Sequence, residues 1–190
     1  FNGFRKLFKD YPQDQIERLV SYAKANGGVS RYKKIEYFFN EIRQEPVLDE
    51  QVDYWAVQFS ELVERDIVEA KSVEGSLEFL REYFNHFDFA IVSGSDQAEL
   101  RRVCKIREID HFFKAILGSP AEKKDNIAAL LSELNWSHDR SVYVGDSNND
   151  LDSARANNLD FVGRCSGLVD WQNFNVMFVL DLSSLHKVLQ

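Results

Sequence analysis

The chain has 190 residues, of which 44% are hydrophobic and 28% charged, and its formal net charge is −8. This length suits one compact domain with a smaller appendage, and the acidic balance argues against a protein that binds nucleic-acid backbones, which needs a basic face. No apolar run approaches the roughly 18 residues of a membrane-spanning helix, and the two cysteines have no metal-ligand spacing. These features favour a reduced, cytoplasmic setting. They leave a small phosphorylated ligand open, because a local cluster of cations can bind one.

The first 70 residues show helical periodicity. Apolar side chains recur three and four positions apart on one face of each of three segments, 16–23, 35–42 and 52–63. The Gly27-Gly28 pair suits the end of the first helix, and Ser30 can cap the second. We therefore predict an all-helical unit over residues 1–70.

Beyond residue 70, short apolar runs alternate with helical stretches. Strands are expected at 87–92, 115–117, 142–144, 161–162 and 176–179, with a turn at 93–95 and a closing helix at 182–189. Strands separated by helices imply right-handed crossovers and a parallel sheet covered on both faces. The predicted fold of residues 71–190 is therefore an α/β, Rossmann-like domain with a parallel sheet.

Ligands of open parallel sheets bind beyond the carboxyl ends of the strands, and three strand ends carry suitable polar residues. The first is Ser93-Gly94, where a hydroxyl and backbone N–H groups can bind an anion, unless Ser93 only caps the next helix. The second is Lys123, with Lys124 as its close rival. A lysine at the start of a helix opposes the helix dipole unless an anion offsets it, and the alternative is a solvated charge pair.

The third strand end has the most informative sequence in the chain, SVYVGDSNND over residues 141–150. An apolar strand ends at Gly145, and the carboxylates of Asp146 and Asp150 follow four positions apart. Carboxylates in this setting suit Mg²⁺, which prefers oxygen ligands and keeps some of its waters. The alternative is an aspartate that caps a helix, followed by an acid on the helix surface.

Together these strand ends resemble the haloacid dehalogenase (HAD) superfamily. Residues 89–93 resemble its second motif, Lys123 its third, and residues 144–150 its fourth. The resemblance covers essentially the whole chain and is nearest to the phosphoglycolate phosphatase and β-phosphoglucomutase-like group. It implies that residues 1–70 form an α-helical cap inserted into a HAD core, which occupies residues 71–190.

The family's first motif, Asp-x-Asp at the end of the first core strand, has no counterpart in the chain. Its aspartates are the nucleophile and the general acid/base. Asp10 and Asp14 lie in a polar, helix-like stretch, and Asp49 and Asp53 precede a helix, so none of them follows an apolar strand. We expect both catalytic aspartates on a strand upstream of Phe1. The alternative is a real fragment or a degenerate relative.

The resemblance implies a Mg²⁺-dependent phosphatase that acts on a small phosphorylated metabolite, such as a sugar phosphate or phosphoglycolate. An upstream aspartate would attack phosphorus and form an aspartyl phosphate, which water hydrolyses. Asp146 would act in catalysis as a metal ligand, and Asp150 would hold the metal site directly or through a water. Ser93, Gly94 and Lys123 would bind the phosphoryl oxygens, with Lys123 as the catalytic lysine.

The segment GGVSR over residues 27–31 resembles the cap loop that faces the active site in this group. Arg31 is predicted to pair with a second anionic group on the substrate, and a solvated arginine at a helix start is the alternative. A phosphomutase with the same core and a non-catalytic HAD-like binding protein remain alternative functions, whereas the acidic fourth motif argues against a true dehalogenase. The sequence leaves the substrate open, and also the choice between monomer and homodimer.

Overall fold

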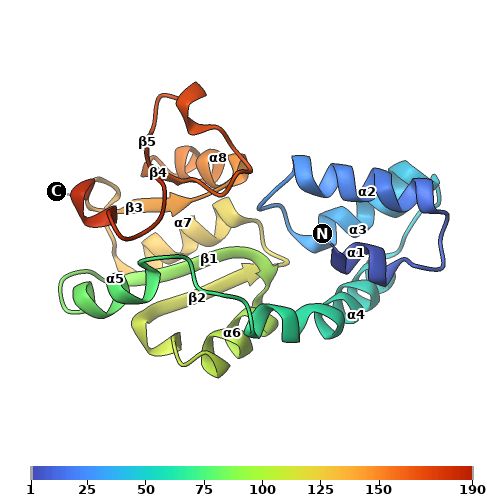
Figure 1. The fold of residues 1–190 in the computed structure, drawn as a ribbon, viewed down its shortest axis with the longest axis horizontal. Coiled ribbons are helices and arrows are strands. Elements are labelled where there is room, and N and C mark those ends of the chain that lie inside the picture. The colour runs from blue at the N-terminus through green and yellow to red at the C-terminus, as the bar shows by residue number, and fades with distance from the viewer. Residues whose placement is uncertain (1, 190) are drawn as a thin grey trace.

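The computed structural model describes residues 2–189, and Figure 1 shows a helical part beside an α/β part. The helical part consists of α1 (Asn2–Leu7), α2 (Gln13–Ala25), α3 (Arg31–Tyr37), a π-helical turn (Phe38–Arg43) and α4 (Asp49–Val68). No strand occurs in residues 2–68, so the helical prediction for this stretch is confirmed. The domain boundary near residue 70 stays a prediction.

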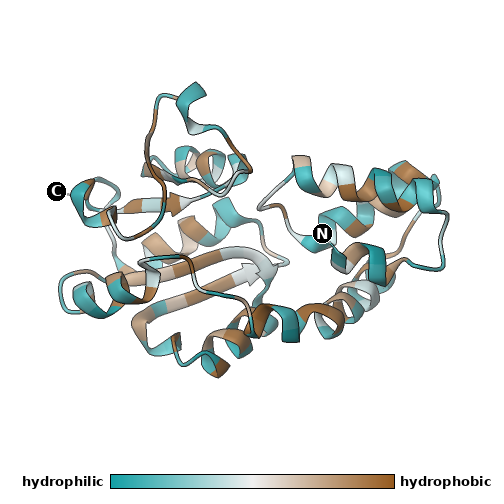
Figure 2. Ribbon diagram, in the orientation of Figure 1, coloured by the Kyte–Doolittle hydropathy of each residue, from teal (hydrophilic) through white to brown (hydrophobic). Residues whose placement is uncertain are grey.

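The helical part folds around its own apolar core. On α2 the predicted stripe is buried, with exposed fractions of 1% or less at Ile16, Leu19, Val20 and Ala23. Phe8 lies at the centre of an aromatic cluster, and its ring stacks on that of Phe38 with centroids 4.2 Å apart. Apolar and polar residues alternate along α2 and α4 in Figure 2, as amphipathic helices require. Among residues 2–189, no helix is long and apolar enough to cross a bilayer.

The α/β part alternates strands and helices as predicted. Its elements are α5 (Ser76–Tyr83), β1 (Phe89–Asp96), α6 (Gln97–Ile106), β2 (Phe113–Ser119), α7 (Lys123–Leu134), β3 (Val142–Gly145), α8 (Asn148–Ala156), β4 (Asp160–Arg164) and β5 (Met177–Val179). All strand pairs in the described residues are parallel, which confirms the predicted α/β class.

The strands form two sheets rather than the one that the sequence predicted. β1 pairs with β2, and β3, β4 and β5 form a second sheet in that order. The hydroxyl of Tyr143 on β3 donates to the carbonyl of Val92 on β1 at 2.9 Å, so a side chain spans the gap between the sheets. Every residue of β1 is half-buried, although strands of a parallel sheet are normally covered on both faces. Since each of these strands lies at the end of its sheet, β1 and β3 each have one unpaired edge in the described chain.

Two further predictions about elements are wrong. Residues 93–95 belong to β1 instead of a turn, because an irregular register between Val92 and Asp96 lets the strand continue past Gly94. The closing helix at 182–189 is reduced to a 3₁₀ turn, Leu185–Lys187. This segment contributes Leu185 to the apolar cluster around Phe79, so packing rather than helix formation holds it.

Arg107 connects the end of α4 to the α/β part through hydrogen bonds. Its guanidinium donates to the carbonyls of Ile67, Val68 and Ala70 at 2.7–3.3 Å. Carbonyls at the end of a helix lack intrahelical partners and carry the negative end of the helix dipole. The contact therefore fixes the direction in which the chain passes from one part to the other.

Candidate active site

A cavity of about 530 Å³ lies between the helical part and the strand ends. The six residues that the sequence singled out all line it: Arg31, Ser93, Gly94, Lys123, Asp146 and Asp150. The strand ends form one wall, because the carboxyl ends of parallel strands meet at one edge of a sheet. The structure thus brings together residues that lie more than 100 positions apart in the chain.

Lys123 points into the cavity, whereas Lys124 does not. Lys123 is the first residue of α7 and lies on the same helix face as the buried Ile127. This face points toward the interior of the α/β part, so the lysine is buried as well. Its side chain is 6% exposed, and its Nζ donates to Oδ1 of Asp150. Lys124 is 53% exposed and pairs with Glu122 at 3.1 Å. Of the two rivals, Lys123 is therefore the one available to a ligand in the cavity.

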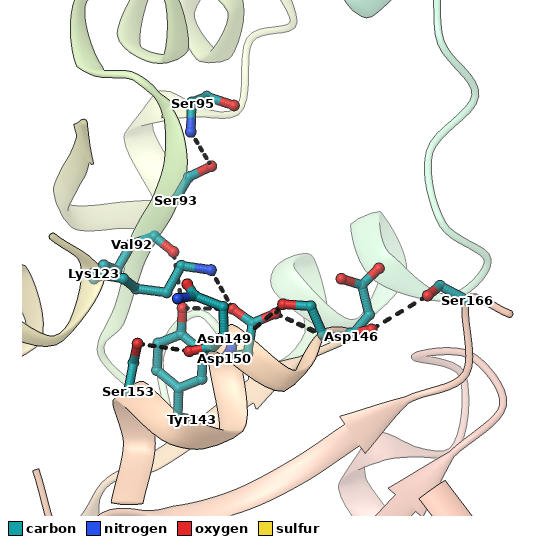
Figure 3. A network of polar contacts seen from close by, with 11 residues as sticks. Val92, Ser93, Ser95, Lys123, Tyr143, Asp146, Asn149, Asp150, Ser153 and Ser166 are labelled. Carbon is teal, nitrogen blue, oxygen red and sulfur yellow. Dashed lines mark hydrogen bonds and ion pairs between the residues drawn. The ribbon is translucent and has the colours of Figure 1, made fainter. Parts of the chain in front are cut away.

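The carboxylate of Asp150 is filled by protein donors, as Figure 3 shows. Oδ2 accepts from the backbone N–H groups of Asp146 and Ser147 at 3.1 and 3.0 Å and from the Ser147 hydroxyl at 2.6 Å. Oδ1 accepts from Lys123. Ser147 is the N-cap of α8, so Asp146 does not cap this helix, and the buried Asp150 is no surface acid. Asp150 positions Lys123 and the strand-to-helix loop.

The pKa of Asp150 reflects this set of donors. Burial alone would raise it, but the charge of Lys123 and the hydrogen bonds from Lys123, Ser147 and the Asp146 N–H outweigh burial and hold the pKa of Asp150 below its ordinary value. Burial raises the pKa of the Tyr143 hydroxyl, which lies 3.3 Å from Oδ1 of Asp150, and the negative charge of Asp150 raises it further. Asp150 is therefore ionised and Tyr143 neutral at neutral pH.

Ser93 and Gly94 lie near the end of β1, at the cavity wall. The N-cap of α6 is Asp96, whose Oδ1 accepts from the N–H of Glu99 at 2.9 Å, so the alternative that Ser93 caps this helix is wrong. The Ser93 hydroxyl accepts from the Ser95 N–H at 3.1 Å, and its proton stays free for an acceptor. A Cβ on Gly94 would lie 2.3 Å from the carbonyl oxygen of Gly28. Glycine is thus required where the α2–α3 loop approaches β1.

Asp146 carries the second carboxylate of the site. Its side chain is 33% exposed, and Oδ2 accepts from Arg164 at 2.6 Å. The sequence reasoning missed Arg164, although it ends β4 and the strand-end rule that selected Asp146 applies to it equally. Residues 2–189 contain no cluster of three metal-ligating side chains. Because Mg²⁺ is often bound by one or two carboxylates together with waters and substrate phosphates, Asp146 fits as one ligand.

Arg31 is held in a buried ion pair. Its guanidinium donates to both carboxylate oxygens of Glu99 on α6, at 2.6 and 2.9 Å, and to the hydroxyl of Ser60 on α4 at 2.6 Å. The side chains of Arg31 and Glu99 are 7% and 1% exposed. The sequence predicted either a substrate anion or solvent around Arg31, and neither prediction included Glu99. Arg31 joins the helical part to the α/β part, and a substrate anion would have to compete with Glu99 for it.

Gly145 allows β3 to pack directly on Asp150. A Cβ at this position would lie 2.3 Å from Cβ of Asp150. Gly145→Ala is therefore expected to displace the carboxylate that holds Lys123 and to lower the free energy of unfolding by about 1–3 kcal/mol, as measured by urea denaturation. The matched control is Gly27→Ala, whose new Cβ would meet nothing closer than 3.3 Å. Equal stability of the two variants would contradict the proposed packing role.

The comparisons with known proteins agree with this geometry. A family model described as haloacid dehalogenase-like hydrolase matches residues 1–164. A predicted phosphatase from Clostridium acetobutylicum has a TM-score of 0.78 at 17% identity, over 99% of this chain and 88% of its own. CbbY from Rhodobacter sphaeroides in complex with phosphate has a TM-score of 0.76 at 16% identity, over 97% of this chain and 87% of its own. A predicted phosphoglycolate phosphatase from Haemophilus somnus 129pt has a TM-score of 0.73 at 17% identity, over 99% and 89%.

No curated protein sequence matches the chain. At 16–17% identity the solved structures show a shared fold, with helices and parallel strands in the same arrangement. The family model goes further, because it matches the sequence itself over most of its length and includes the motifs around Ser93, Lys123 and Asp146. The resemblance found in the sequence is confirmed: the chain belongs to the haloacid dehalogenase-like hydrolases, a family of enzymes.

Proposed function

We propose that the protein is a phosphatase that hydrolyses a small phosphorylated metabolite, such as a sugar phosphate or phosphoglycolate, through an aspartyl phosphate. The observation that carries the proposal is the buried Lys123, fixed by Asp150 and facing the same cavity as Ser93 and Gly94. A lysine, a hydroxyl and backbone N–H groups around one cavity are suited to the oxygens of a phosphoryl group. Lys123 would act in catalysis by stabilising the charge that develops on them.

The nucleophile would come from a strand that precedes Phe1. Among the described residues, β1 and β3 each have one unpaired edge, and residues of both strands line the cavity. An apolar strand that ends in Asp-x-Asp could pair with both and join the two sheets into one. Phe4 on α1 lines the same cavity, so the chain enters the helical part beside this gap. These observations support the position that we propose for the nucleophile and the general acid/base.

Asp146 would be the ligand for Mg²⁺ within the described chain. When bound, the ion would neutralise negative charge on the phosphoryl group. Arg164, which now pairs with Asp146, would compensate the carboxylate when no cation is present. Asp150 would support the metal site indirectly rather than as a ligand, because protein donors occupy both of its oxygens.

The setting that we propose is cytoplasmic, with a small phosphorylated metabolite as partner, no nucleic acid or membrane, and a monomeric or homodimeric state. Both cysteines, Cys104 and Cys165, are free thiols, which fits a reducing compartment.

A substrate screen on the full-length protein tests the function. With Mg²⁺ present, we expect phosphate release from small phosphate esters, and we expect Asp146→Asn to lower it by about 100-fold or more, since a metal ligand is lost. Lys124→Gln, outside the cavity, is the control. Product analysis separates a phosphatase from a phosphomutase, because a mutase returns an isomeric ester in place of phosphate. A full-length protein that binds phosphate esters but never turns them over would favour the non-catalytic alternative.

A further inference from the structure

Lys34 lies on the helical wall of the cavity, opposite the strand ends. It belongs to α3, one turn after Arg31, and its side chain is half-buried among the residues that line the cavity. The neighbouring Lys33 differs: it is 55% exposed and pairs with Glu36 at 3.6 Å. Two adjacent lysines on one short helix thus have opposite surroundings, and only Lys34 lines the cavity.

The other cations that line the cavity have carboxylate partners, whereas Lys34 has none in the described part of the chain. Arg31 pairs with Glu99, Lys123 with Asp150, and Arg164 with Asp146. Within residues 2–189, the ammonium group of Lys34 makes no hydrogen bond or ion pair. A lysine that is partly removed from water without an anion is unfavourable for folding. Such a group is expected where a ligand supplies the missing anion.

The charged groups that shift the pKa of Lys34 are positive. Burial lowers the pKa of Lys34 to about 8, and repulsion from Lys123 and then Arg31 contributes to the same shift. Lys123 stands on the α/β wall of the cavity and Lys34 on the helical wall. A ligand with a negative group at each end would relieve the repulsion between the two walls.

We propose that Lys34 binds a second anionic group of the substrate, so that the preferred substrate is a phosphate ester that carries another carboxylate or phosphate. The inference rests on the proposed function, in which Lys123 holds the phosphoryl group that is hydrolysed. It transfers to Lys34 the role that the sequence predicted for Arg31. Binding by Arg31 requires that its buried pair with Glu99 breaks, whereas Lys34 has no ion pair within residues 2–189.

Two matched pairs of compounds test the inference on the full-length protein. Phosphoglycolate is compared with ethyl phosphate, and 1,3-propanediol bisphosphate with propyl phosphate. For the wild type we expect a higher kcat/KM and a tighter Kd for the doubly anionic member of at least one pair. The pair that shows the preference identifies the second group as carboxylate or phosphate.

Lys34→Gln is expected to lower this preference about tenfold or more, because one charge-assisted hydrogen bond is lost. Lys33→Gln, the matched control on the same helix, is expected to retain the preference. Both variants are first checked by thermal melting, where Lys34→Gln should melt no lower than the wild type, since an unpaired charge is removed.

The affinities are also measured by calorimetry without Mg²⁺, so that the inference does not depend on turnover. A binding preference that Lys34→Gln abolishes, in a protein that hydrolyses no phosphate ester of the substrate screen, would support Lys34 and contradict the phosphatase. Three outcomes would overturn the role of Lys34. In the first, Lys34→Gln keeps the preference of the wild type. In the second, the variant loses affinity for singly and doubly anionic compounds alike, which places the lysine at the reacting phosphate or at a catalytic aspartate. In the third, the wild type prefers neither doubly anionic compound.

Discussion

Replacing Lys123 by methionine in the full-length protein is expected to lower phosphate release by at least about 100-fold, the usual effect of removing one donor from a charge-stabilising site. It should also lower the free energy of unfolding by about 3 kcal/mol, because Asp150 keeps its charge in a buried place without its cation. Lys124→Met, one position away on the exposed side of α7, should leave the free energy of unfolding nearly unchanged. Phosphate release and urea denaturation measure the two effects.

The pH dependence of Lys123→Met provides an internal check. The pKa of Asp150 is lowered in the folded protein, so its contribution to stability is fully present above the ordinary carboxyl pKa of about 4 and is lost as pH falls through the folded value. Without Lys123, the pKa of Asp150 should be higher than in the wild type, because the charge and the hydrogen bond of Lys123 no longer oppose burial. The variant should therefore lose most stability, relative to the wild type, at neutral pH, and the difference should shrink in acid. A stability difference that does not change with pH would contradict the ion pair.

Breaking the pair between Arg31 and Glu99 is expected to have the second large effect. Arg31→Met or Glu99→Leu alone should lower the free energy of unfolding by about 3–5 kcal/mol, because each leaves one buried charge without its partner. The double variant should lose clearly less than the sum of the single losses, since no unpaired charge remains and the site becomes apolar. Urea denaturation of the four proteins gives the coupling energy.

The exposed pair between Arg5 and Glu17 is the control for this cycle. Their side chains are 37% and 45% exposed, so Arg5→Met should lower the free energy of unfolding far less than Arg31→Met does. If the losses from Arg31→Met and Glu99→Leu are simply additive in the double variant, the pair does not join the two parts in the way that the distances indicate. Substrate kinetics of Arg31→Met also show whether Arg31 has the predicted role in substrate binding.

Local patterns in the sequence were sufficient to predict most of the helices and strands. The stripe of Ile16, Leu19 and Val20 has the period of a helix, and apolar runs such as 142–144 can be read without knowing their neighbours. Two sheets instead of one could not be read in this way, because sheet pairing depends on segments distant in the chain. The closing segment failed for a related reason: Leu185 is held by contact with Phe79 and not by its own helix propensity.

The residues that the sequence singled out lie around one cavity, but their pairing was not predicted, and neither were Arg164 and Lys34. Strand ends and motif spacing located Lys123, Asp146 and Asp150, since these follow from position along the chain. The partner of Arg31 is Glu99, 68 residues away, and no local pattern marks such a contact. Equally, a sequence shows that Asp150 is a carboxylate but not that its oxygens are already filled. Lys34 looks like any surface lysine until its surroundings are known.

The cations that line the cavity belong to a molecule whose net charge is −8. An anion approaching from solution therefore meets a repulsive field at long range, whereas inside the cavity it meets Lys34, whose charge has no carboxylate partner in residues 2–189. At physiological ionic strength, fields between exposed charges fade over about 8 Å, whereas half-buried groups such as Lys34 are screened much less. Dissolved salt thus weakens the repulsion at the surface more than the attraction within, and it eases the entry of anionic ligands. This is the opposite of its effect on proteins whose basic surfaces steer anions from afar.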